Sequence, residues 1–118
     1  MMSDLDGAKA QEIRRRLLEE REVVLASSRS SRESRDPVTL DQPSVGRLSR
    51  MDALQGQAMA LETERRRQAR LQRIDAALER LDEGEFGYCI ACGEPIAEKR
   101  LEFDPTVPTC VECAEATD

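Results

Sequence analysis

The sequence contains no histidine and no tryptophan, and aromatic residues make up only 3% of its 118 residues. So few bulky side chains argue against a wide hydrophobic core, and the lack of histidine removes the commonest acid–base catalyst. Charged residues reach 36%, and Ala, Leu, Glu and Arg dominate. This composition is typical of long helices or a coiled coil. Disorder is the alternative, but leucines at regular spacing argue against it.

The chain also lacks long apolar runs. No stretch of eighteen apolar residues could span a bilayer, and no N-terminal segment resembles a signal peptide. We therefore expect a cytoplasmic protein that does not bind a membrane. Thiols stay reduced in the cytoplasm, so the four cysteines favour a metal or redox site over two disulfides, which would need an oxidising compartment.

Charge is unevenly distributed along the sequence. Residues 1–80 carry 16 basic and 14 acidic side chains, a net charge of +2, whereas residues 81–118 carry 2 and 10, a net charge of −8. Nucleic-acid binding depends on Lys and Arg neutralising phosphates. The acidic C-terminal third therefore argues against direct, sequence-specific DNA binding, and a basic or metal-rich protein surface suits it better.

The N-terminal part predicts a helix over about residues 5–30. Leu5, Ile13, Leu17, Val24 and Leu25 recur there at helical spacing. A serine- and arginine-rich stretch follows, and two prolines and a glycine then predict an irregular connection over about 36–48.

A second, longer helix is predicted over about 49–83, with Ser49 as its N-cap and Asp52 three residues later. One face carries a stripe of apolar residues: Leu54, Ala58, Leu61, Leu71, Ile74, Leu78 and Leu81. Such a helix is about 50 Å long and must bury its stripe, most simply against the first helix. We therefore expect a mostly α protein. Residues 1–83 form an antiparallel coiled-coil hairpin, and residues 84–118 form a separate small module.

Four cysteines lie in that module as two Cys-x-x-Cys pairs with seventeen residues between them: Cys89, Cys92, Cys110 and Cys113. This spacing is typical of a zinc site in which two short loops each supply two thiolates. Gly93 suits the left-handed position that such a loop often needs, and a short helix is expected after the second pair. Phe86, Tyr88 and Phe103 are the candidate packing residues around one zinc ion.

Two other uses of the cysteines are weaker. A thioredoxin-like thiol oxidoreductase needs a βαβ unit, and the sequence has no apolar strands to supply one. Catalysis by the metal needs an open coordination position, which four thiolates do not leave. We expect a structural zinc ion and no enzymatic activity.

The stretch "EGEFGYCIACGEPIAEKRLEFDPTVPTCVEC" resembles the zinc finger of the DksA/TraR family of bacterial transcription regulators over about thirty residues. The resemblance implies a monomer that binds RNA polymerase, inserts its hairpin through the secondary channel and often acts together with ppGpp. An adaptor that binds another protein or a nucleic acid through a zinc ribbon is the alternative.

The family's tip motif, Asp-x-x-Asp-x-Ala, is altered here. Ungapped counting places Gly46 and Ser49 at the aspartates and Met51 at the alanine. With a gap, Asp36 enters the motif. The candidate tip residues are Asp41, Ser49, Arg50, Asp52 and Ala53, although Asp52 also suits a helix N-terminus.

The family's ppGpp pocket is altered as well. Arg66 and Arg73 match two of its basic positions, whereas Asp104 and Ala114 occupy two others. An aspartate facing a pyrophosphate is repulsive. The neighbouring run of arginines at 65–67 is interpreted as a solvated helix face, with contact to phosphate or to an acidic protein as the alternative.

Overall fold

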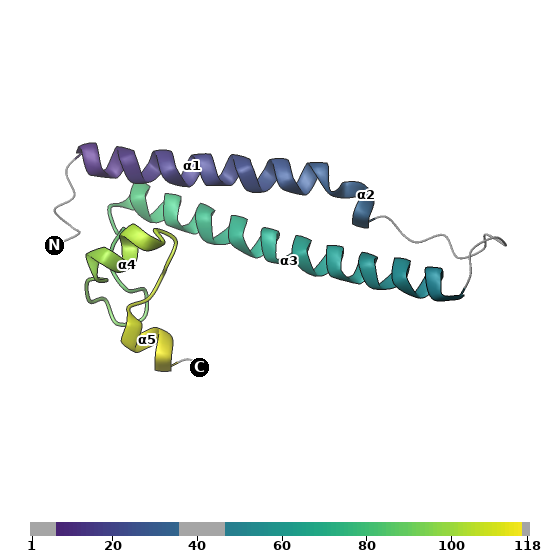
Figure 1. Ribbon diagram of the computed structural model, residues 1–118. Coiled ribbons are helices and arrows are strands. Elements are labelled where there is room, and N and C mark those ends of the chain that lie inside the picture. Colours follow the sequence, from purple (N-terminus) through teal and green to yellow (C-terminus); the bar gives the residue numbers. More distant parts are fainter. Residues whose placement is uncertain (1–6, 36–46, 117–118) are drawn as a thin grey trace. The chain divides into compact units, whose positions relative to one another are not determined.

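The computed structural model describes residues 7–35 and 47–116, and these residues form helices without strands. The helices are α1 (Gly7–Ser30), α2 (Arg32–Arg35), α3 (Arg47–Glu83), α4 (Glu98–Phe103) and α5 (Val111–Ala116), labelled in Figure 1. The predicted fold class, a helical hairpin followed by a four-cysteine module with a short C-terminal helix, is confirmed. The predicted connection, with Asp36, Asp41 and Gly46, lies largely outside the described residues. Among the described helices, none has the length and apolar character to cross a bilayer.

The chain divides into two compact units. One contains residues 7–21 and 71–116, and the other contains residues 22–35 and 47–70 of the described chain. Helices α1 and α3 contribute to both units.

In the first unit, α1 and α3 run antiparallel and enclose the main core. Leu17 and Ile74 are fully buried, and Arg14 and Arg21 form ion pairs with Asp82 and Asp75 at 2.7 and 2.8 Å. Residue numbers that increase along α1 are therefore paired with residue numbers that decrease along α3, as expected for antiparallel helices. The other buried apolar residues come from α3 and from the cysteine module: Leu71, Ala77, Phe86, Cys89, Ile96 and Leu101.

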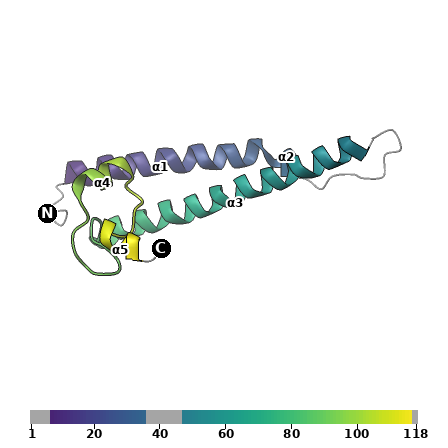
Figure 2. The same cartoon turned by 60° about the horizontal axis from the view of Figure 1, so that its bottom comes forward.

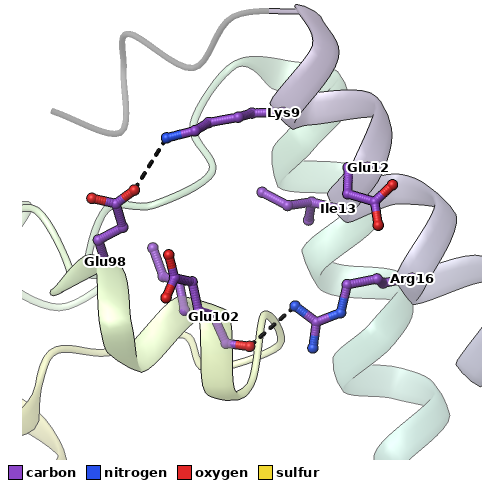
Figure 3. A pocket seen from close by; sticks show the side chains of 7 residues that line it. Lys9, Glu12, Ile13, Arg16, Glu98 and Glu102 are labelled. Atoms are coloured by element: carbon purple, nitrogen blue, oxygen red, sulfur yellow. Dashed lines mark hydrogen bonds and ion pairs between the residues drawn. The ribbon is translucent and has the colours of Figure 1, made fainter.

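Helix α4 lies alongside α1 in this unit (Figure 2). Lys9 Nζ contacts a carboxylate oxygen of Glu98 at 3.1 Å, and Arg16 donates a hydrogen bond to the carbonyl of Glu102 at 3.1 Å. Figure 3 shows these two contacts on either side of a hollow of about 210 Å³, which Ile13 and Leu101 also line. Charged contacts therefore surround an apolar junction between α1 and α4.

The second unit repeats the antiparallel pairing with polar groups. Ser28 Oγ donates to Glu64 at 2.7 Å, and the amide of Gln57 donates to the carbonyl of Arg35 at 3.4 Å. Helix α1 ends in this unit at Ser30. Ser30 and Ser31 hydroxyls donate to backbone carbonyls three residues earlier, and such local bonds compete with helical ones.

The structure corrects two expectations about the helices. The described part of α3 begins at Arg47, so Ser49 lies inside the helix and is not its N-cap. Arginine and leucine are good helix formers, which accounts for the earlier start. Leu54, Ala58 and Leu61 were expected to be buried as part of the apolar stripe, but Leu54 and Leu61 are 42% and 49% exposed and Ala58 is exposed as well.

Candidate metal centre

The first cysteine pair is held by a tight loop directly after α3. The Cys89 N–H donates to the Glu94 carbonyl at 2.8 Å, and the Gly93 N–H donates to the Cys89 carbonyl at 2.9 Å. Gly93 has φ = +79°, a left-handed conformation that side chains disfavour. The predicted need for glycine at this position is therefore met by the geometry.

The second pair lies at the start of α5. Cys110 precedes the helix, Cys113 lies in its first turn, and the Ala114 N–H donates to the Cys110 carbonyl at 2.9 Å. A hydrogen bond from the Ile90 N–H to the Pro108 carbonyl, also 2.9 Å, joins the two loops. Backbone contacts thus bring the two pairs to one place.

The four sulfur atoms lie within 4.8 Å of one another, and those of Cys92 and Cys110 are 3.8 Å apart. Zinc–sulfur bonds of about 2.3 Å in a tetrahedron require sulfurs about 3.8 Å apart. The donor set and its spacing fit one zinc ion, and the predicted cofactor is confirmed.

The electrostatics of the thiols also fit a cation. Burial opposes ionisation of Cys89, but backbone N–H groups of Cys110, Cys92 and Ala91 outweigh it and lower the pKa of its thiol to about 6. The pKa of Cys113 is raised to about 12, because its thiol hydrogen-bonds to the other three sulfurs. Four neighbouring thiols cannot all ionise unaided, and a divalent cation removes that penalty.

The packing around the cysteines differs in part from expectation. Phe86 is 3% exposed and packs in the core, and Tyr88 is partly buried. Phe103, however, is 90% exposed, so its predicted packing role is wrong. Leu101 takes the buried position on α4, and a residue two positions later points about 200° away around a helix.

The candidate tip residues that the structure describes lie in the first turns of α3. Ser49, Asp52 and Ala53 are exposed and Arg50 is partly exposed. Asp41 lies outside the described residues. Their role at a tip stays a prediction.

The candidate ppGpp residues have partners within the chain. Arg66 is 79% exposed and pairs with Glu62 at 3.3 Å. Arg73 Nη2 lies 3.6 Å from Oδ2 of Asp104. The other carboxylate oxygen of Asp104, Oδ1, accepts two hydrogen bonds from Thr106, one from the backbone N–H and one from the hydroxyl. The aspartate that replaces a basic residue is thus an internal partner of Arg73.

The arginine run at 65–67 is only partly a solvated face. Arg65 and Arg66 are 77% and 79% exposed, as interpreted, but Arg67 is only 24% exposed. Its guanidinium donates to Ser31 at 2.9 Å and contacts Glu64 at 3.4 Å. Sequence reasoning missed this network, for which Glu64 three residues before Arg67 was the available signal.

Residues 84–118 match the family model described as the prokaryotic dksA/traR C4-type zinc finger. The chain is 35% identical over 94 residues to the RNA polymerase-binding transcription factor DksA of Haemophilus influenzae, covering 78% of this chain and 61% of that protein. It is 43% identical over 58 residues to the protein of that name from Caulobacter vibrioides, covering 49% and 41%. The matches thus span less than two thirds of either relative.

Among solved structures, the transcription factor DksA2 of Pseudomonas aeruginosa is similar to this chain with a TM-score of 0.75. The two are 27% identical, and the match covers 98% of this chain and 92% of that one. The likeness therefore extends over the helices as well as the finger.

Proposed function

Because the chain belongs to the DksA/TraR C4-type zinc-finger family, we propose that it is a transcription regulator that binds RNA polymerase through the secondary channel. The observation that carries the proposal is the likeness to DksA2 over nearly the whole chain, helices and finger together. In this proposal the protein works in the cytoplasm, as a monomer, and not as an enzyme.

The zinc ion has a structural role in this proposal. Cys89, Cys92, Cys110 and Cys113 would fill all four coordination positions and leave none for a substrate or an activated water. The ion supplies the positive charge that holds four thiolates together. The chain's own residues orient those thiolates through the Gly93 loop and the start of α5.

The hairpin end is the proposed contact with the polymerase interior. The acidic candidates there are Asp41 and Asp52, with Ser49, Arg50 and Ala53 beside them in the sequence. Carboxylates are ligands that Mg²⁺ prefers, so an acidic tip suits a site near the catalytic metal of a polymerase.

The test is binding of the zinc-loaded protein to core RNA polymerase of its host, with Fe²⁺ in place of the active-site metal to generate local hydroxyl radicals. We expect cleavage of the chain near residues 41–53. Asp52→Ala should alter transcription without changing the fold. Arg65→Ala, on the same helix, is the matched control and should leave transcription unchanged.

An adaptor that uses a zinc ribbon predicts a different result. Binding of a nucleic acid would then depend on Arg65 and Arg66 and would weaken steeply as the salt concentration rises. Hydroxyl radicals from the polymerase active site would not cleave the chain near residues 41–53. A folded, zinc-loaded protein that does not bind polymerase would refute the proposal.

A further inference from the structure

Arg80 lies in the last turn of α3, just before the cysteine module, and its guanidinium is partly desolvated. Among the side chains that the structure describes, its Nη2 is the one buried nitrogen or oxygen without a hydrogen-bond partner. Arg65, Arg67 and Arg73 on the same helix all contact carboxylates. Arg80 therefore differs from its neighbours, since a buried guanidinium normally has a partner.

The position of Arg80 at the end of a helix accounts for a basic residue but not for its burial. A cation near the C-terminus interacts favourably with the helix dipole whether it is exposed or partly buried, so the dipole does not require burial. Burial of an arginine nitrogen without a partner costs free energy that the dipole effect alone does not offset. A stronger negative charge nearby would explain why the side chain stays there.

The surroundings of Arg80 contain such a charge. Arg80 lines a hollow of about 430 Å³ together with Tyr88, Cys89, Ile90 and Gly93, and with Glu85. Cys89 is one of the four thiolate donors, and Gly93 belongs to the loop that orients it. A zinc ion with four thiolates carries a formal charge of −2, and Cys89 is the ligand that lines the same hollow as Arg80.

We propose that Arg80 is the electrostatic partner of the zinc–thiolate centre and stabilises its negative charge from the side of Cys89. An arginine suits this position because its guanidinium keeps its positive charge even when partly buried. The inference is independent of polymerase binding, since it concerns only the metal centre and the helix that leads into it.

A bound anion is the alternative to the metal centre as the partner of the Arg80 guanidinium. The same hollow is lined by Glu85 and by Cys89, and a carboxylate and a thiolate each repel an anion. The charge balance therefore favours the metal centre as the partner of Arg80.

The first test measures zinc affinity by competition with a chromogenic chelator. Replacing a residue that supports metal ligands typically weakens metal binding 10- to 100-fold, and we expect a loss of about that size for Arg80→Gln. Arg80→Lys keeps the charge and should retain most of the affinity. The matched control is Arg65→Gln, because Arg65 is 77% exposed and pairs with Glu62.

A second measurement separates an electrostatic role from a packing role. In the chelator-treated protein, Arg80→Gln should leave the melting temperature of the helices unchanged, because the cysteine module that covers Arg80 is then unfolded. In the zinc-loaded protein the same substitution should accelerate zinc release by a thiol-modifying reagent several-fold, because the thiolates lose a neutralising cation. Equal destabilisation of both forms would mean that Arg80 only packs.

The anion alternative has its own result. Inorganic phosphate at millimolar concentration would raise the melting temperature of the unsubstituted protein and not that of Arg80→Gln. That outcome, or unchanged zinc affinity in Arg80→Gln, would overturn the proposal.

Discussion

At the scale of single residues, the second unit pairs its helices through charged and polar groups. Glu64 is only 15% exposed and contacts Arg35 at 3.1 Å, Arg67 at 3.4 Å and Ser28 at 2.7 Å. Hydrogen bonds from Gln68 and Ser28 are the main causes that lower the pKa of its carboxyl. Because these partners come from both helices, the network favours one register of the hairpin over others.

We expect Glu64→Gln to destabilise the protein by about 1–3 kcal/mol, the typical cost of leaving partly buried donors unsatisfied. A carboxyl group whose pKa is lowered on folding stabilises the protein at pH values above its ordinary pKa of about 4.5. This stabilisation is lost as the pH falls below that value. Between about pH 5 and about pH 3, the variant should therefore lose less stability than the unsubstituted protein. Urea denaturation across this range measures the effect, and parallel acid curves would contradict it.

Leu17 is the fully buried contribution of α1 to the core of the first unit. Leu17→Ala should cost about 2–5 kcal/mol, because it removes buried methyl groups and leaves a cavity. Leu18→Ala, next in sequence but 47% exposed, is the control and should cost much less. Chemical denaturation measures the free energy of unfolding of both variants. Similar decreases in the two would contradict the assignment of Leu17 to the core.

The resemblance to the DksA/TraR family implies a ppGpp contact at Arg73, and Asp104 should weaken it. Its carboxylate already pairs with Arg73, and a pyrophosphate at Arg73 would face it. Asp104→Asn keeps the oxygen that accepts from Thr106 but removes the charge. We expect the affinity for ppGpp to rise about fivefold or more, from the Coulomb energy of one like charge at close range. Calorimetric titration tests this, and Asp104→Asn combined with Arg73→Gln should lose the gain.

At the scale of elements, α3 ends in a glycine-dependent cap. The Gly84 N–H donates to the Leu81 carbonyl at 3.3 Å and the Glu85 N–H to the Arg80 carbonyl at 2.9 Å, with Gly84 at φ = +75°. This is the hydrogen-bond pattern of a Schellman motif. The cap turns the chain from the helix into the cysteine module.

Glycine-to-alanine substitutions inside α3 and at its C-terminal cap should change the stability of the protein in opposite directions. Gly84→Ala should destabilise by about 1–2 kcal/mol, because alanine disfavours the left-handed conformation. Gly56→Ala, in the exposed helix interior with no atom within 4 Å of the added methyl, should stabilise by about 0.5–1 kcal/mol. Thermal unfolding compares the two, and the same sign for both would refute the backbone explanation.

At the scale of the whole molecule, the two units depend on different interactions. The first unit combines an apolar core with the metal centre, whereas the second relies on helix pairing through Glu64 and its partners. Small modules with little apolar surface often fold only with their metal. Metal removal should therefore affect the cysteine module more than the helices.

Removal of zinc with a chelator should unfold residues 84–116 and leave most of the helical signal. The described part of this segment contains only the two six-residue helices α4 and α5, so the far-ultraviolet circular dichroism should fall only slightly. Amide hydrogen exchange should lose protection at Cys89 and Ile96 but keep it at Ile74. Cys92→Ser should reproduce the effect, and complete loss of helicity would contradict it.

The sequence by itself determined the features that depend on local chain geometry. Two Cys-x-x-Cys pairs predicted the cluster of four sulfurs, because a two-residue gap holds the sulfurs of each pair close together. Gly93 supports this geometry at the first pair, and the start of α5 supports it at the second. Helical periodicity likewise predicted both long helices and the buried face at Leu71 and Ile74.

Only the tertiary structure decided which of several similar side chains are buried. Arg65 and Arg67 are alike in sequence, yet one is solvated and the other contacts Ser31. Phe103 is apolar yet exposed, and Arg80 is charged yet has a buried nitrogen without a partner. Burial depends on what a distant segment places opposite a residue, and neither composition nor periodicity carries that information.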